Sequence, residues 1–246
     1  MSDAEARSPY RALLWPVIYT IPALALLIGL GIWQIQRLHW KEGLLAHIHD
    51  QMHAPAVDLP VKIDNPKIWE YRRVRVTGHY QNGKELYLYA AGPGSQAGYL
   101  VFTPLVRAEG KAVLVNRGWV PEKLKDPKAR EKGQREGTVT IEGVGRLTGG
   151  AGPFTPDNEP AKNEWFQRDI PQMAKAVGEP LAPVIIDRDD APVPGGWPLG
   201  GRTRIDIPNN HLEYAITWFS LAYVLVIIFA IYAWRAFKAA KSPSDG

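Results

Sequence analysis

The sequence predicts a membrane-anchored α+β protein in which two transmembrane helices flank a β-rich external domain. Two long apolar stretches without a formal charge predict the helices, one near each end of the 246-residue chain. Between them, short segments that alternate apolar and polar residues predict strands with one solvent-exposed face. We therefore divide the chain into a tail (1–12), a transmembrane helix (13–36), a β-rich domain with a juxtamembrane helix (37–209), a second transmembrane helix (210–234) and a second tail (235–246).

The first apolar stretch runs from Leu13 to Gln36 and lies between the charges of Arg11 and Arg37. A run of about 20 apolar residues is long enough to cross a bilayer as one helix. This stretch is too long for the core of a signal peptide, so we expect an uncleaved helix. The pattern of residues 40–52, which follow it, predicts an amphipathic helix near the membrane surface.

The second apolar stretch, Tyr214 to Trp234, also carries no formal charge over about 21 residues, again enough to span. Asn210 is suited to cap this helix, because an asparagine side chain can accept a hydrogen bond from a free amide of the first turn. Basic residues precede the first span and follow the second, which predicts that both termini lie in the cytoplasm.

The predicted location is the bacterial inner membrane, with the β-rich domain in the periplasm. Asp3 and Glu5 stand in the opening residues, whereas a mitochondrial transit peptide is rich in arginine and poor in acidic residues. The two hydrophobic spans make membrane lipids expected partners. The net charge of +4 lies mostly in the tails and one loop, so we expect no nucleic-acid surface.

The central domain should hold six strands and one short helix. The hairpin signal Asn82-Gly83 predicts that the first strand pairs with the second. The turn at Glu109-Gly110 predicts that the third strand pairs with the fourth. Asp169 should cap the short helix, 169–177. The strands are expected at 71–80, 85–90, 98–107, 111–120, 138–147 and 183–187.

We expect no enzyme. The chain has no cysteine, which removes thiolate nucleophiles and thiolate metal ligands. Ser95 lies in GPGSQAG, which does not match the nucleophile elbow of serine hydrolases. His49 and His53 resemble part of the zinc-protease motif, but Asp50 replaces the required glutamate. A membrane-tethered hydrolase stays an alternative, although no nucleophile–base pair can be assembled for it. Arg117 suits either an anionic ligand or a structural role, stacked on Trp119 or paired inside the domain.

A candidate ligand site lies where the second span enters the membrane. His211, Ala215, Trp218 and Ala222 share one helical face. A neutral imidazole can bind a haem iron, and an indole adds stacking area for the porphyrin. The alternative is a histidine that is solvated at the headgroups.

On the first span, Gly29, Trp33, Gln36 and Trp40 share a face, and Gly29 would permit close approach of the helices. The expected cavity at the outer leaflet is lined by His211, Tyr214, Trp218, Trp33 and Gln36.

Four segments together resemble the Surfeit locus protein 1 family over about Leu26 to Tyr232: GLGIWQIQRLHWKEGLL, VLVNRGWVP, NEWFQRD and NNHLEYAITWFSLA. The resemblance implies a cytochrome c oxidase assembly factor that binds haem a and helps to place it in oxidase subunit one. It also implies that His211 ligates the iron and that Trp218 packs at the macrocycle, with subunit one and haem a synthase as partners. The alternative is a haem-free scaffold that organises assembly intermediates.

Overall fold

The computed structural model describes residues 9–201 and 209–241. The chain forms two compact units, one of residues 1–46 and 206–246 and the other of residues 47–205. The first unit contains two long helices and the second contains a β-sheet. The predicted membrane-anchored α+β class is therefore confirmed. Residues 1–8 and 242–246 of the two predicted tails lie outside the described residues.

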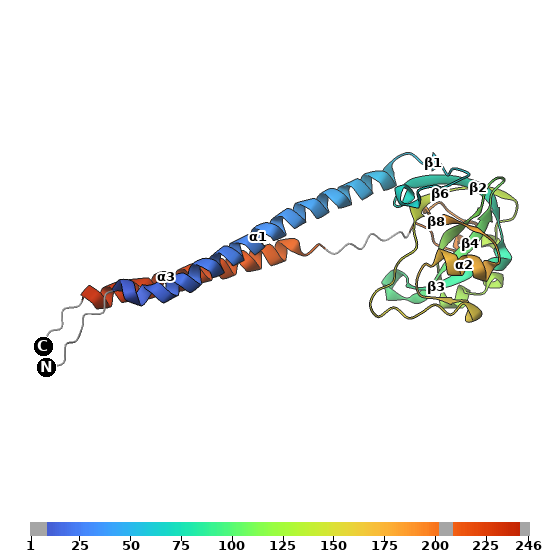
Figure 1. Ribbon diagram of the computed structural model, residues 1–246. Helices are drawn as coiled ribbons and strands as arrows, with labels where there is room; N and C mark the ends of the chain where they lie inside the picture. Colours follow the sequence, from blue (N-terminus) through green and yellow to red (C-terminus); the bar gives the residue numbers. More distant parts are fainter. Residues whose placement is uncertain (1–8, 202–208, 242–246) are drawn as a thin grey trace, which may run out of the picture. The chain divides into compact units, whose positions relative to one another are not determined.

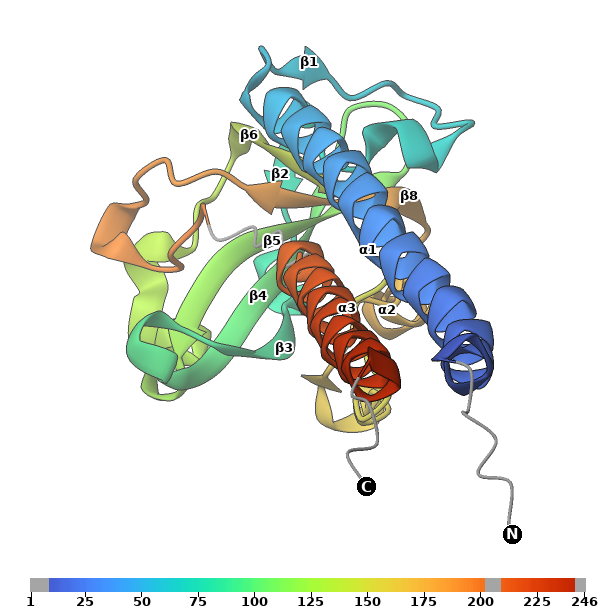
Figure 2. The same ribbon diagram turned by 90° about the vertical axis from the view of Figure 1, so that its left-hand side faces the viewer.

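The two long helices are α1, Pro9–His53, and α3, His211–Lys241. Both are long and apolar enough to cross a membrane. They run side by side (Figures 1 and 2). The amphipathic helix expected at 40–52 is present, but it continues the first span without a break. At 1.5 Å per residue, the 45 residues of α1 extend for about 68 Å, roughly twice the hydrocarbon core of a bilayer.

The described residues of the second unit form eight strands and one short α-helix. The two-residue strands β1 and β7 were not predicted from the sequence, and the other six lie within three residues of the expected ends. The elements are β1 Val57–Asp58, β2 Arg73–Tyr80, β3 Leu86–Ala91, β4 Ala97–Val106, β5 Ala112–Pro121, β6 Thr138–Arg146, β7 Glu164–Trp165, α2 Ile170–Val177 and β8 Leu181–Arg188.

The sheet closes into a barrel. Its strand order is β1-β2-β6-β8-β5-β4-β3-β7, and β2 pairs with β4 as well. Strands β2, β6, β8, β5 and β4 therefore form a closed ring, from which β3 and β7 continue beyond β4. The closing contact is short, because only His79 with Val106 and Tyr80 with Leu105 are paired between β2 and β4. Strands β5 and β8 are parallel, whereas the other ring pairs are antiparallel.

One predicted turn was wrong. Strand β2 pairs with β6 and β4 rather than with β3, so Asn82-Gly83 does not join a hairpin. The turn is the 3₁₀ helix η2, Asn82–Lys84, and neither Asn82 nor Gly83 has the positive φ that a two-residue hairpin turn requires. The second predicted turn is confirmed, because Gly110 has a φ of +82° and connects the antiparallel pair β4 and β5.

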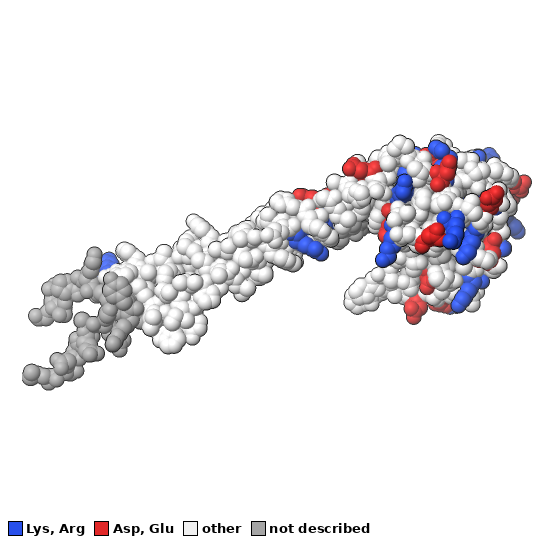
Figure 3. Space-filling model, turned by 45° about the horizontal axis from the view of Figure 1, so that its top comes forward, with Lys and Arg blue, Asp and Glu red and all other residues white. Residues whose placement is uncertain are grey.

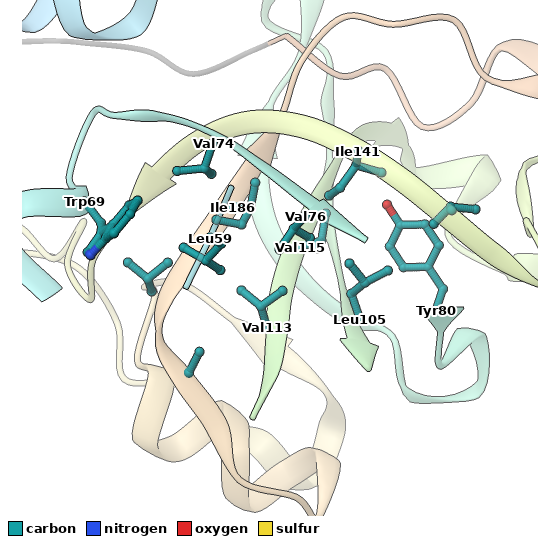
Figure 4. Close-up of a cluster of buried hydrophobic side chains, with 13 residues drawn as sticks. Leu59, Trp69, Val74, Val76, Tyr80, Leu105, Val113, Val115, Ile141 and Ile186 are labelled. Atoms are coloured by element: carbon teal, nitrogen blue, oxygen red, sulfur yellow. The ribbon is translucent and has the colours of Figure 1, made fainter. Parts of the chain in front are cut away.

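Burial follows the predicted alternation. In β2, Val74, Val76, Gly78 and Tyr80 are buried, and the intervening positions after Arg73 are exposed. The main cluster of buried side chains lies inside the ring, with Trp69 and Tyr80 at opposite ends of the view in Figure 4. A second cluster lies beneath α2, whose Ile170, Met173 and Val177 are buried.

Asp169 caps α2 as expected, since its carboxylate accepts a hydrogen bond from the Gln172 amide at 2.9 Å. On the face shown in Figure 3, the charged side chains gather over the β-rich unit, and the helices are almost free of them.

Candidate functional site

Small residues bring α1 and α3 into contact. Ala215 and Ala222 of α3 are buried, as expected for the face that they share. On α1, a Cβ atom added at Gly31 would lie 2.7 Å from the ring of Phe219. Since that is closer than a Cβ contact allows, the absence of a side chain at Gly31 makes room for the aromatic ring.

A hydrogen bond joins the two helices at the first turn of α3. His211 Nδ1 lies 2.7 Å from Gln34 Oε1, although the residues are 177 positions apart in sequence. Gln34 is only 8% exposed, whereas His211 is half-buried. An amide oxygen can only accept, so in this orientation of the Gln34 amide Nδ1 carries the proton and donates it.

The other imidazole nitrogen of His211, Nε2, differs from Nδ1 in its surroundings. Nε2 makes no hydrogen bond with any residue in the described part of the chain. With the proton on Nδ1, Nε2 carries the lone pair that a metal ion requires. Metal-binding histidines are commonly held in this way, with the far nitrogen donating to an oxygen acceptor. The side chains present therefore fit an axial bond to a haem iron.

Aromatic side chains lie near this imidazole. The Trp33 ring meets the His211 ring edge-on, with 6.5 Å between centroids and 85° between planes. Trp33 is half exposed, at 52%. Trp218 is half-buried and lies two turns beyond His211 on the same helical face. An aromatic ring thus lies beside the imidazole on α1, and another lies two turns away on α3.

Two residues expected at the helix contact are not there. Gly29 is exposed and has nothing within 4 Å of a Cβ position, so the close approach that we predicted occurs at Gly31 instead. Gln36 is exposed too, and Gln34 takes its place beside His211. Since residues two apart on a helix point in different directions, Gly31 and Gln34 lie on another face of α1 than the predicted pair. Tyr214, which was also expected to line the cavity, is 56% exposed.

Arg117 lies in a buried ion-pair cluster of the β-rich unit. Its side chain is 3% exposed and lies 3.4 Å from Glu85, and it donates to the Gly133 carbonyl. Burial lowers the pKa of Arg117, and the nearby Tyr80 and Glu85 counteract that effect. Arg130 also pairs with Glu85, whose side chain is 2% exposed. The structure therefore favours the second sequence interpretation, an arginine that is paired inside the domain.

The remaining catalytic alternatives gain no support. Ser95 is exposed in the loop before β4. His49 and His53 stack at 4.1 Å, and His53 Nδ1 donates to the His49 carbonyl. No group of three or more metal-ligating side chains occurs within residues 9–201 and 209–241.

Trp119 and Trp165 are core residues. They lie in the segments VLVNRGWVP and NEWFQRD, two of the four that resemble the family. Trp119 is 1% exposed and donates to the Ala90 carbonyl at 3.0 Å. Trp165 is fully buried and donates to Asn163, which in turn donates to the Glu85 carbonyl. For Trp119 the sequence holds a signal of burial, since the residue lies in the predicted strand 111–120, whereas no strand is predicted around Trp165.

The fold and the site define a membrane-anchored β-barrel protein with a histidine at the contact of two spans. The profile of the SURF1 family matches residues 21–223. The chain therefore belongs to the SURF1 family. It is 38% identical to Surfeit locus protein 1 of Mus musculus over 233 residues, covering 89% of this chain and 75% of the mouse protein.

Two further relatives show similar coverage. Surfeit locus protein 1 of Homo sapiens is 39% identical over 223 residues, which cover 84% of this chain and 73% of the human protein. A SURF1-like protein of Caenorhabditis elegans is 35% identical over 235 residues, which cover 86% of this chain and 71% of the nematode protein. The family match thus includes the barrel and part of each long helix.

Proposed function

We propose that this protein is a cytochrome c oxidase assembly factor that binds haem a and assists its insertion into oxidase subunit one. The observation that carries the proposal is the Gln34–His211 hydrogen bond, which leaves Nε2 of His211 available at the contact of the two spans. Membership of the SURF1 family supports the assembly role.

His211 would hold the haem through Nε2, and Trp218 would pack beside the macrocycle. When bound, the haem supplies an iron that accepts the nitrogen lone pair. Phe219 fills the space over Gly31, so the helices leave no room for a flat molecule between them at that level. Trp33, whose ring meets the His211 ring edge-on, marks the side from which the haem would approach His211. A single axial nitrogen gives a bond that a carrier can release.

The protein performs no chemical step in this proposal, because it binds, orients and hands over the haem. Its partners would be oxidase subunit one and the haem a synthase, and the barrel would dock one of them. The proposed location is the bacterial inner membrane, with both termini in the cytoplasm and the barrel in the periplasm, which follows from the charges that flank the spans.

An optical spectrum of the protein purified from cells that make haem a tests the proposal. We expect haem absorption from the unaltered protein and its loss in His211→Ala. His39→Ala is the matched control, because His39 is an exposed histidine on α1. The haem assignment fails if the unaltered protein carries no haem, and the site assignment fails if His211→Ala keeps the full signal.

The close helix packing at Gly31 and Phe219 also suits a haem-free scaffold, because an anchor requires nothing more of its two spans than tight packing. A colourless protein that still co-purifies with oxidase subunit one would establish this second function.

A further inference from the structure

A cavity in the β-rich unit has no part in the haem proposal. Its volume is about 190 Å³, and all of its lining residues belong to residues 47–205. The lining combines three arginines with a tyrosine, two carboxylates and a short apolar wall. Its members are Tyr80, Arg117, Arg135, Thr140, Ile141, Glu142, Arg188, Asp189, Ala191, Pro192 and Val193.

Arg188 is a buried cation in this lining that forms no ion pair with a described carboxylate, although Asp189 and Asp190 partly offset the effect of burial on its pKa. It is 8% exposed, and burial lowers the pKa of its guanidinium. Its three hydrogen bonds go to the backbone carbonyls of Arg117, Ala191 and Pro198. A guanidinium has five N–H groups, so two of them find no acceptor among the residues that the structure describes. A buried charge of this kind is stable only when it is neutralised or fully hydrogen-bonded.

Two further donors line the same cavity. Arg135 is exposed, and its guanidinium makes no ion pair with a described residue. The Tyr80 hydroxyl makes no hydrogen bond within the described ranges, while the Arg117 guanidinium lies 4.6 Å from the Tyr80 ring centroid. The tyrosine ring is anchored in the core cluster, so the position of its hydroxyl is fixed.

The two carboxylates of the lining are already engaged with cations outside it. Glu142 lies 3.0 Å from Arg73 and 2.9 Å from Arg75. Asp189 lies 4.0 Å from Arg73. Arg117 is itself paired with Glu85 outside the lining, so Arg188 and Arg135 are the lining arginines that form no ion pair with a described residue. The apolar wall beside them favours an organic acid over inorganic phosphate.

We propose that this cavity binds a short organic monocarboxylate. The carboxylate group would accept hydrogen bonds from Arg188, Arg135 and the Tyr80 hydroxyl, because guanidinium groups pair well with planar carboxylates. The organic part would contact the apolar wall of Ile141, Pro192 and Val193. A free acid and a carboxylate at the end of a larger molecule share this chemistry.

The test is a calorimetric titration of butyrate into the full-length protein in detergent. Butyramide, the uncharged analogue of butyrate, is the control ligand. We expect saturable binding of butyrate and none of butyramide. Tyr80→Phe keeps the ring in the core and removes one donor, which should raise the Kd about threefold to tenfold. Arg135→Gln should raise it about threefold, since an exposed charge contributes less. Lys175→Gln, an exposed cation on α2, should leave the Kd unchanged.

Three other results count against the proposal. No saturable butyrate binding, or binding that Tyr80→Phe and Arg135→Gln leave unaltered, overturns the proposal. Phosphate that binds more tightly than butyrate overturns the ligand class. A peptide that ends in a free carboxylate, titrated beside butyrate, shows whether the acid is free or the end of a chain. Because the cavity and the haem site share no residue, His211→Ala should bind butyrate normally.

Discussion

At the scale of single residues, the contact between His211 and Gln34 is the observation on which the proposed haem site rests. A histidine that only faces the headgroup water needs no partner. Here a glutamine that is almost fully buried accepts from Nδ1. Polar residues inside membrane spans are costly, so their positions commonly mark function. We therefore expect Gln34 to set the strength of the iron bond.

Replacing Gln34 by leucine should weaken haem a binding by roughly tenfold or more, as for other partners of metal-binding histidines. The reason is that the imidazole loses the acceptor that fixes its tautomer and orientation. Titration of haem a into the purified protein, followed by absorption, measures the effect. Gln36→Leu is the matched control because Gln36 is exposed on the same helix.

Gln34→Glu adds a readout beyond affinity. A carboxylate acceptor should make the imidazole a stronger donor and lower the midpoint potential of the bound haem, while Gln36→Glu should leave it unchanged. Equal haem affinities and potentials in the Gln34 and Gln36 variants would reduce the Gln34 contact to a packing role.

Glu85→Gln should destabilise the β-rich unit by about 3–5 kcal/mol, because two buried arginines would lose their common carboxylate. Chemical unfolding followed by tryptophan fluorescence measures the change. Glu131→Gln serves as the control, since Glu131 is an exposed acid of the 3₁₀ helix η5, Pro127–Gly133. A loss as small as that of the control would mean that Arg117 and Arg130 find other acceptors.

At the scale of elements, the sequence revealed the strands but not their partners. Alternation of apolar and polar side chains in β2 and β6 locates each strand and its buried face. Pairing depends instead on contacts between distant segments. The β2–β6 ladder and the insertion of β8 between β5 and β6 have no local signature.

The same limit affected the helices. Periodicity placed His211 and Ala215 on one face, and the contact confirms that Ala215 is buried. It did not show which face of α1 meets them, because several faces of an all-apolar helix carry small residues. Gly31 and Gln34 could be recognised only once both helices were in place.

Gly78→Ala tests how the ring closes. A Cβ atom at Gly78 would lie 2.3 Å from the Val106 carbonyl oxygen, next to the short β2–β4 contact. We expect a loss of about 1–3 kcal/mol in the free energy of unfolding, as for other overpacked sites. The Gln81 amide, which donates to the Pro104 carbonyl at this junction, should exchange its hydrogen faster.

Gly83→Ala controls for the loss of a glycine, because nothing lies within 4 Å of its Cβ position. If Gly78→Ala leaves both stability and Gln81 exchange at the level of this control, the β2–β4 contact does not close the ring.

At the scale of the whole molecule, the absence of cysteine makes the proposed topology directly testable. A cysteine introduced at Lys175, which is exposed on α2, should react with a membrane-impermeant maleimide in spheroplasts. A cysteine at Ser244 in the C-terminal tail should react only after lysis. Labelling of the tail with protection of the barrel would reverse the proposed orientation, and the unaltered chain serves as the blank.

The position of β8 in the ring governs the order in which the protein can be completed. Strands β5 and β6 are neighbours in sequence, yet the ring places β8 between them, and β8 ends at Arg188, about 40 residues after β6. At a synthesis rate of about 5–20 residues per second, the edges of β5 and β6 that will pair with β8 stay unpaired for seconds. Such edges recruit other chains and attract proteases. The newborn polypeptide is therefore most vulnerable in this interval, when its first span can already be anchored and its last barrel strand has yet to emerge.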